Sequence, residues 1–167
     1  MSYEVLSSKG KYWTCQQSAW PDYLKVATAF GWAPDGAFFK NDEVGLGDHP
    51  SGSYLGNDWQ QVTDADARAF GTALNLAVAT INAGSPMTDT QVTVLKAFEI
   101  DDGEPFYATF TLTEQQRAAF LKMKVEYLAE HPDEVRTIRA CHGTFDVNIR
   151  GMMDLAEVAA AGGFTIA

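Results

Sequence analysis

The stretch TDADARAFGTALNLAVATIN, residues 63–82, decides the fold, because it predicts one long helix around which the other segments pack. Thr63 is a good N-cap, and the acidic residues Asp64 and Asp66 favour the positive end of the helix dipole. Asp66 also stands at the capping-box position, where Glu is usual. No charge follows Arg68, and apolar residues recur at helical spacing: Phe70, Ala73, Leu74, Ala77, Val78 and Ile81. We therefore expect neighbours to cover this helix on more than one side.

Upstream of this helix, the sequence predicts a hairpin and a second, shorter helix. Residues 4–8 and 11–17 have the alternation of two short strands, joined by a turn at Lys9-Gly10. Pro21 then opens a helix that ends near Gly31, since proline is tolerated in a first turn and glycine is common after a last one. Residues 37–62 are rich in glycine and predict a long loop, a kind of segment that is often functional.

Downstream, the break at 83–86 ends the long helix, and residues 89–100 fit a helix or a strand equally well. Five further elements are expected: a strand at 105–112, a helix from Thr113 to about Glu130, a strand at 145–149, a helix at 155–161 capped by Asp154, and a strand at 164–166. This order predicts a single α+β domain over residues 1–167. We expect a small antiparallel sheet, with three to four helices packed mainly on one face.

Acidic residues dominate the charge of the chain, with 22 acids against 12 bases and a net charge of −10. Residues 41–67 contain no Lys or Arg, and a second acidic cluster spans residues 99–104. Such a balance argues against direct nucleic-acid binding, which needs cations to neutralise phosphates. It is compatible with solubility, with a basic protein partner, or with competition for a basic groove that holds nucleic acid.

Several functional classes lack their sequence signals. The longest apolar runs fall short of a membrane span, and the N-terminus has no signal-peptide pattern, so we expect a cytoplasmic protein. Cys15 and Cys141 are expected to be reduced and partly buried, and Cys141-His142 is no catalytic pair, because neighbours on a strand face opposite ways. His49, beside Asp48, and His131 and His142 lack metal-ligand spacing. We therefore predict no metal, no cofactor and no catalytic residues.

Three segments carry a resemblance: AWPDYLKVATAFGWAPDG (19–36), SGSYLGNDWQQVTDADARAFGTAL (51–74) and DLAEVAAAGGFTI (154–166). They resemble a family of uncharacterised bacterial proteins with GWxPxG, SGxYxxNDxQxV and C-terminal GGFxI motifs. The chain departs from that pattern at Ala37, Trp59 and Ala160-Ala161, and residues 83–150 stand outside it as an insertion. The resemblance implies a bacterial or phage origin. The family has no known activity, so the resemblance implies no catalytic residues.

The loop before the long helix holds the best candidates for a ligand site: Tyr54, Asn57, Asp58 and Gln61. A glycine-rich loop that leads into a helix can bind an anion through free backbone N–H groups. The structural alternative is that these residues form turns and caps with their own backbone. Trp59 is either an exposed interface anchor or a cap on the core, whereas Trp20 and Trp32 are expected in the core.

Two function classes remain. The first is a non-enzymatic acidic protein that binds and blocks a basic protein partner, either a toxin-immunity protein or an inhibitor of a defence complex such as an anti-CRISPR. Its predicted interface consists of Asp42, Glu43, Asp48, Asp58, Trp59, Asp101, Asp102 and Glu104. The second is a small-molecule-binding domain or an enzyme that uses the 48–61 loop, including Tyr54, Asn57, Asp58 and Gln61. The sequence does not indicate the oligomeric state.

Overall fold

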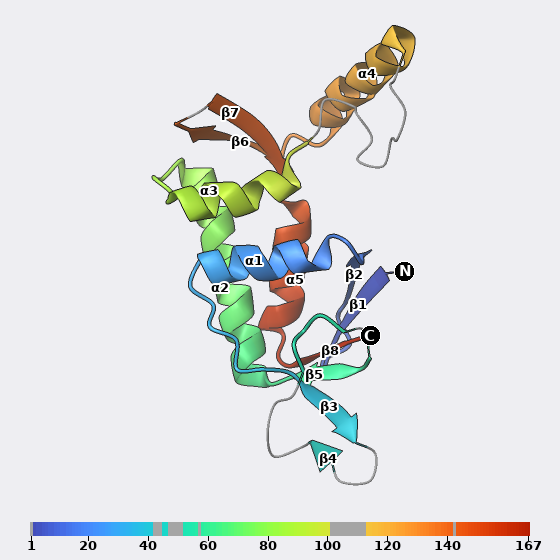
Figure 1. The fold of residues 1–167 in the computed structure, drawn as a ribbon, viewed down its shortest axis with the longest axis vertical. Helices are drawn as coiled ribbons and strands as arrows, with labels where there is room; N and C mark the ends of the chain where they lie inside the picture. The colour runs from blue at the N-terminus through green and yellow to red at the C-terminus, as the bar shows by residue number, and fades with distance from the viewer. Residues whose placement is uncertain (1, 42–44, 47–51, 57, 101–112, 142) are drawn as a thin grey trace.

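The computed structural model of the chain describes residues 2–41, 45–46, 52–56, 58–100, 113–141 and 143–167. The strands are β1 (Ser2–Ser7), β2 (Tyr12–Gln16), β3 (Phe38–Asn41), β4 (Gly45–Leu46), β5 (Gln60–Val62), β6 (Val135–Ala140), β7 (Gly143–Asn148) and β8 (Phe164–Ile166). The helices are α1 (Trp20–Ala29), α2 (Asp64–Ala83), α3 (Asp89–Leu95), α4 (Glu114–Glu130) and α5 (Arg150–Ala160), with a 3-10 turn η1 (Lys96–Phe98) after α3 (Figure 1).

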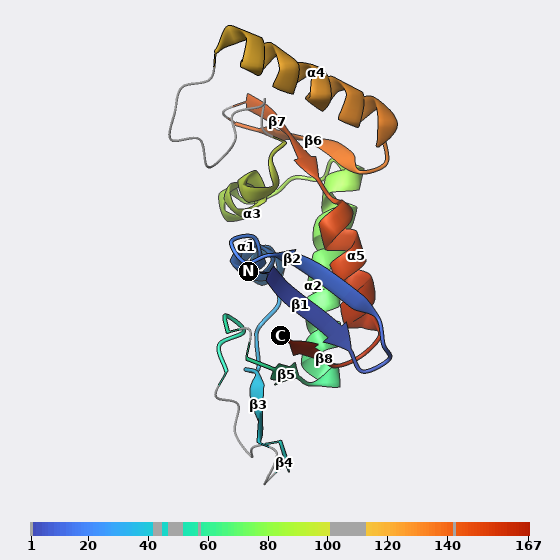
Figure 2. The same ribbon diagram turned by 90° about the vertical axis from the view of Figure 1, so that its right-hand side faces the viewer.

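The main sheet has the strand order β2-β1-β8-β5-β3-β4, and every neighbouring pair is antiparallel. β8 enters the sheet between β1 and β5, so that the last strand of the chain lies beside the first (Figure 2). The hairpin of β6 and β7 stands apart from this sheet, at the end of the molecule where α3 and α4 lie. The predicted α+β fold with a small antiparallel sheet is confirmed.

Helices α1, α2 and α5 cover one face of the main sheet, in agreement with the prediction that helices pack mainly on one face. Aromatic side chains connect the two layers: Tyr3 of β1 stacks on Trp20 of α1, and Phe70 of α2 packs against Phe164 of β8. α5 also contacts β1 and β2. The opposite face of the sheet is open to solvent, since Leu6 is 45% exposed there. Successive side chains of a strand point to opposite faces, so they alternate between the core and the solvent.

Helix α2 is the centre of the fold. The side chain of Thr63 accepts a hydrogen bond from the backbone N–H of Asp66, at 3.3 Å, and Gly84 ends the helix in the left-handed conformation. α2 packs against both α1 and α5, which confirms the prediction of more than one neighbour. The approach to α5 is close: a Cβ at Gly71 would lie 3.1 Å from the Ala156 carbonyl oxygen.

The predicted hairpin, the helix opened by Pro21, the helix after Thr113 and the strand at 164–166 are also confirmed. Residues 89–100, left open by the sequence, begin as helix α3 and continue into η1. The predicted long loop at 37–62 was wrong in part, because β3, β4 and β5 lie within it. These strands are only two to four residues long, and β3 and β5 form by pairing with segments far away in the sequence. The predicted strand at 105–112 lies outside the described residues.

Two further predictions need correction near the C-terminus. β6 was not expected at all, and the last helix begins at Arg150 rather than at 155. Asp154 therefore does not cap this helix: it lies inside α5 and forms an ion pair with Arg150, at 3.0 Å. The side chain of Asn148 is the acceptor for the first helical N–H, that of Arg150, at 2.9 Å.

Candidate interaction surface

The turn at residues 52–60 is organised around one buried amide side chain, that of Gln60, which is 2% exposed. Its Oε1 accepts a hydrogen bond from the backbone N–H of Tyr54, at 3.0 Å. Its Nε2 donates to the carbonyl oxygen of Gly56, at 3.1 Å, and to Oδ1 of Asp58, at 2.8 Å. A side chain at Gly52 would overlap Oε1 of Gln60. A buried polar group that is fully bonded in this way fixes the backbone around it.

Two bulky residues of this turn adopt positive φ angles, Tyr54 at 64° and Trp59 at 62°. They are the only residues other than glycine to do so in the part of the chain that the structure describes. This conformation is costly for an aromatic residue and persists only where the surroundings enforce it. The bonds from the Gln60 side chain to Tyr54, Gly56 and Asp58 supply that constraint.

The aromatic side chain of Tyr54 points inward, where it belongs to a buried network. Its hydroxyl donates to Asp66, which is 1% exposed, and accepts from the backbone N–H of Gly36, at 2.7 Å. Oδ1 of Asp66 also accepts from Nε1 of Trp32, at 2.8 Å. Asp66 therefore does not complete the capping box that its position suggested, because its carboxylate is bonded to residues far away in the sequence. Burial, strengthened by Asp66, raises the pKa of Tyr54, so its hydroxyl remains protonated at neutral pH.

Trp59, in contrast, is 63% exposed and lies beside the exposed Asp58. Of the two alternatives for this tryptophan, the structure has the exposed one. Trp20 and Trp32 are 0% and 5% exposed, so their prediction as core residues is confirmed. The turn thus combines a rigid backbone with a large apolar side chain that no part of the described chain buries.

Not all the predicted site residues come together. Gln61 alternates with the buried Gln60 and lies on the open face of the sheet, opposite Thr165 of β8. Tyr54 lies on the helix-covered side, so these two members of the predicted ligand site face different ways. Seven predicted residues lie outside the described part of the chain: Asp42, Glu43, Asp48, Asn57, Asp101, Asp102 and Glu104. Sequence analysis missed Gln60, although its spacing from the apolar Val62 could have indicated an inward-facing strand position.

A groove of about 570 Å³ adjoins this turn. Leu55, which is 53% exposed, lies at the groove together with Ser53 and Tyr54, and α1 and α3 form its other walls. The lining is mostly apolar: Pro21, Leu24, Ala29, Trp32, Pro34 and Val94 are among its residues. The exposed apolar surface near the turn is therefore larger than the side chain of Trp59 alone.

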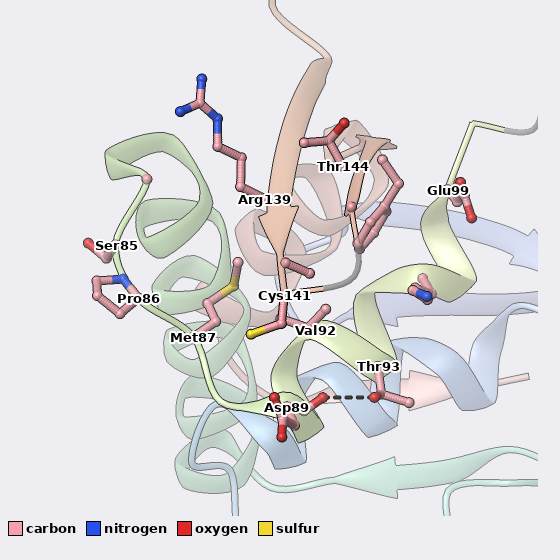
Figure 3. A pocket seen from close by; sticks show the side chains of 15 residues that line it. Ser85, Pro86, Met87, Asp89, Val92, Thr93, Glu99, Arg139, Cys141 and Thr144 are labelled. Atoms are coloured by element: carbon pink, nitrogen blue, oxygen red, sulfur yellow. Dashed lines mark hydrogen bonds between the residues drawn. The ribbon is translucent and has the colours of Figure 1, made fainter.

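Two other cavities lie beside residues of the β6–β7 hairpin. The first, of about 610 Å³, lies between the 84–87 segment, α3 and the β6–β7 hairpin; in Figure 3, Met87, Val92 and Cys141 approach one another while Arg139 extends outward. The second, of about 410 Å³, lies between α1, η1 and the start of α5. Cys141 is exposed and Cys15 half-buried, and neither forms a disulfide. Burial raises the pKa of Cys15 to about 12, so this thiol stays protonated at neutral pH.

The described residues contain no cluster of three or more His, Cys, Asp or Glu side chains that could hold a metal ion. Within the same residues, no helix is both long and apolar enough to cross a membrane. A scan against protein-family models and searches of curated proteins and of solved structures gave no match. The resemblance to the bacterial family with the GWxPxG motif therefore stays a prediction.

Proposed function

We propose that the chain is a non-enzymatic acidic interaction protein that binds and blocks a basic macromolecular partner. The observation that carries this proposal is the Trp59 side chain, 63% exposed on a backbone held at positive φ. An exposed tryptophan loses little conformational entropy on binding when its backbone is already fixed. Tryptophan is also the type of residue that dominates the binding energy of protein interfaces.

The net charge of −10 supports a basic partner. Complementary charge accelerates association, whereas burial of a tryptophan anchor slows dissociation. In this proposal the negative charge comes from Asp58 and from the acidic residues at 42–48 and 101–104 that the sequence predicts in the interface. Trp59 is the apolar anchor. Such a protein would block its partner by covering a basic groove, as an anti-CRISPR inhibitor or a toxin-immunity protein would.

The proposal is tested by affinity purification of the tagged chain from its host, with washes at low and at high salt and mass spectrometry of the retained proteins. We expect one dominant basic protein that is lost at high salt. The variant Asp58→Asn/Trp59→Ala should abolish this retention. The asparagine introduced in this variant still offers an oxygen to the Gln60 side chain, so the turn should keep its form and the melting temperature should change little.

Helix α4 offers a matched control, Glu126→Gln/Met123→Ala. It removes the same charge and another exposed apolar side chain, since Met123 is 62% exposed. This control should retain the partner as the unmodified chain does. A preparation without any basic partner, or equal retention by both double variants, would overturn the proposal.

A second candidate function is the binding of an apolar small molecule in the groove of about 570 Å³. The observation that favours it is the lining itself, to which Ser53, Tyr54 and Leu55 contribute from the predicted site loop. A thermal-shift screen of apolar compounds would test it. The expected result is a raised melting temperature that the groove variant Ala29→Trp abolishes.

A further inference from the structure

The cavity of about 410 Å³ combines aromatic and acidic side chains. Three aromatic residues line it, Tyr23 of α1, Phe98 of η1 and Tyr127 of α4. Three carboxylates line it as well, those of Glu99, Glu134 and Asp154, against the single guanidinium of Arg150. The lining therefore has two more negative than positive groups. Aromatic faces and carboxylates together are the surroundings that an organic cation prefers.

The single guanidinium of the lining, that of Arg150, is bonded to Asp154 and contributes only a longer-range attraction to Glu134. Arg150 lies 3.0 Å from Asp154, four residues further along α5. Glu134 accepts a hydrogen bond at Oε2 from the hydroxyl of Tyr127, at 2.8 Å, and Tyr127 in turn accepts from Asn148, at 2.7 Å. These bonds orient Glu134 while its Oε1 keeps no partner among the described residues. Glu134 and Glu99 can therefore pair with an incoming cation.

The side chain of Tyr23 provides an independent indication of a ligand. It is only 8% exposed, and its ring packs edge-on against Trp13 and Phe98. Its hydroxyl lies over Gly151, where any side chain would overlap it, and both residues line the cavity. Among the described residues no hydrogen-bond partner meets this hydroxyl. Since the fully buried polar side-chain atoms of these residues are all bonded, the hydroxyl itself is accessible, although the rest of the side chain is buried. A hydroxyl held in place at a cavity without a protein partner can bond to a ligand there.

We propose that this cavity binds the guanidinium group of an arginine side chain that the basic partner presents. This step rests on the proposed function, because a basic partner supplies the arginine. A guanidinium is planar, stacks on aromatic rings and directs five N–H donors outward. The acceptors of the cavity come from separate segments of the chain, with Tyr23 on α1, Glu99 after η1 and Glu134 before β6. Lysine, with one compact ammonium group, matches such a spread of acceptors less well.

The inference is tested by NMR titration of the whole chain with N-acetyl-arginine amide, with the neutral N-acetyl-citrulline amide as the control ligand. We expect saturable shifts at the backbone amides of Gly151 and Ile100 with the arginine probe only. The variants Tyr23→Phe and Glu134→Gln should each weaken binding by about tenfold, since each loses a hydrogen bond or charge that faces the cation.

Both variants preserve the local structure. Phenylalanine keeps the ring contacts of Tyr23, and glutamine still accepts the hydrogen bond from Tyr127. The matched controls Tyr12→Phe, on the open face of the sheet, and Glu126→Gln, on α4, should leave the affinity unchanged. Shifts of equal size with both ligands, or unaltered affinity in Tyr23→Phe and Glu134→Gln, would overturn the inference.

The two proposals can fail separately. If a basic partner is captured but Glu134→Gln captures it equally and the arginine probe gives no saturable shift, the proposed function stands and the cavity inference falls. If the probe binds as expected but no basic partner is captured, the proposed function falls. In that case the cavity binds a free small molecule with a guanidinium group, and the inference that a partner presents the arginine is overturned.

Discussion

Helices α2 and α4 begin in the same way and end in different surroundings. Each has a threonine N-cap whose side chain accepts a backbone hydrogen bond, Thr63 for α2 and Thr113 for α4. α2 buries nine residues between its neighbours, whereas none of the described residues of α4 is buried. Leu121 and Val125 of α4 are 42% and 64% exposed. Figure 1 shows α4 at the far end of the molecule from the main sheet.

This comparison separates what nearby residues determine about a helix from what distant residues determine. Capping and hydrophobic periodicity are local, and they predict that a helix forms and which residues share a face. Stability comes from a partner for that face, and the partner of α2 is α5, which begins only at Arg150, far along the chain. Equivalent substitutions in α2 and α4 should therefore have unequal effects on the folded state.

The largest expected effect is that of Gly71→Leu in α2. A Cβ at this position already meets the Ala156 carbonyl and the Ala159 Cβ at 3.1 Å, and these atoms of α5 cannot move independently. We expect the free energy of unfolding to fall by about 3 kcal/mol, at the upper end of overpacking effects. Urea denaturation measures this loss.

The matched change in α4 is Ala119→Leu, at an exposed position. Alanine and leucine are both good helix formers, so the free energy of unfolding should change by less than about 0.5 kcal/mol. Equal losses in the two variants would show that the contact between α2 and α5 does not carry the stability of the fold.

The second prediction compares the third helical residue of each helix, Asp66 in α2 and Gln116 in α4. Asp66→Ala removes the acceptor for Trp32 and Tyr54, leaving two buried donors unpaired. We expect a loss of about 2 kcal/mol, since each unsatisfied buried group costs on the order of 1–3 kcal/mol and we take the lower end for both. Gln116→Ala removes only a capping-box bond of 2.9 Å in an exposed helix. A thermal melt of each variant decides the comparison, and similar melting temperatures would contradict it.

Asp66 also marks the limit of what the sequence could predict. Its place in the first turn was correct, but its partners Trp32 and Tyr54 lie 34 and 12 residues away. The same holds for β3 and β5, because β3 pairs with β5 and β5 pairs with β8 across long stretches of sequence, which leaves little trace in three or four residues. Elements with local signals were predicted well, such as the β1–β2 hairpin and both long helices.

The candidate site likewise has features that the sequence predicted and features that it did not. The exposed Trp59 was one of two alternatives, because exposure depends on whether another segment covers the turn. The amide that holds the turn, Gln60, was overlooked in favour of its neighbour Gln61. The cavity of about 410 Å³ could not be predicted from the sequence, since its residues come from α1, η1, α4, β7 and α5 and meet only in the folded chain.

The smallest effect is expected from the two N-caps, Thr63→Ala and Thr113→Ala. Each loses a side-chain acceptor worth about 1 kcal/mol to its helix. In α2 this loss should lower the free energy of unfolding of the whole domain by that amount, because the helix cannot unfold apart from the core. In α4 it should leave global stability unchanged and instead accelerate amide hydrogen exchange within residues 114–119, because an exposed helix opens locally. A global loss of equal size from Thr113→Ala would mean that α4 is coupled to the core as tightly as α2, and the distinction between the two helices would then fail.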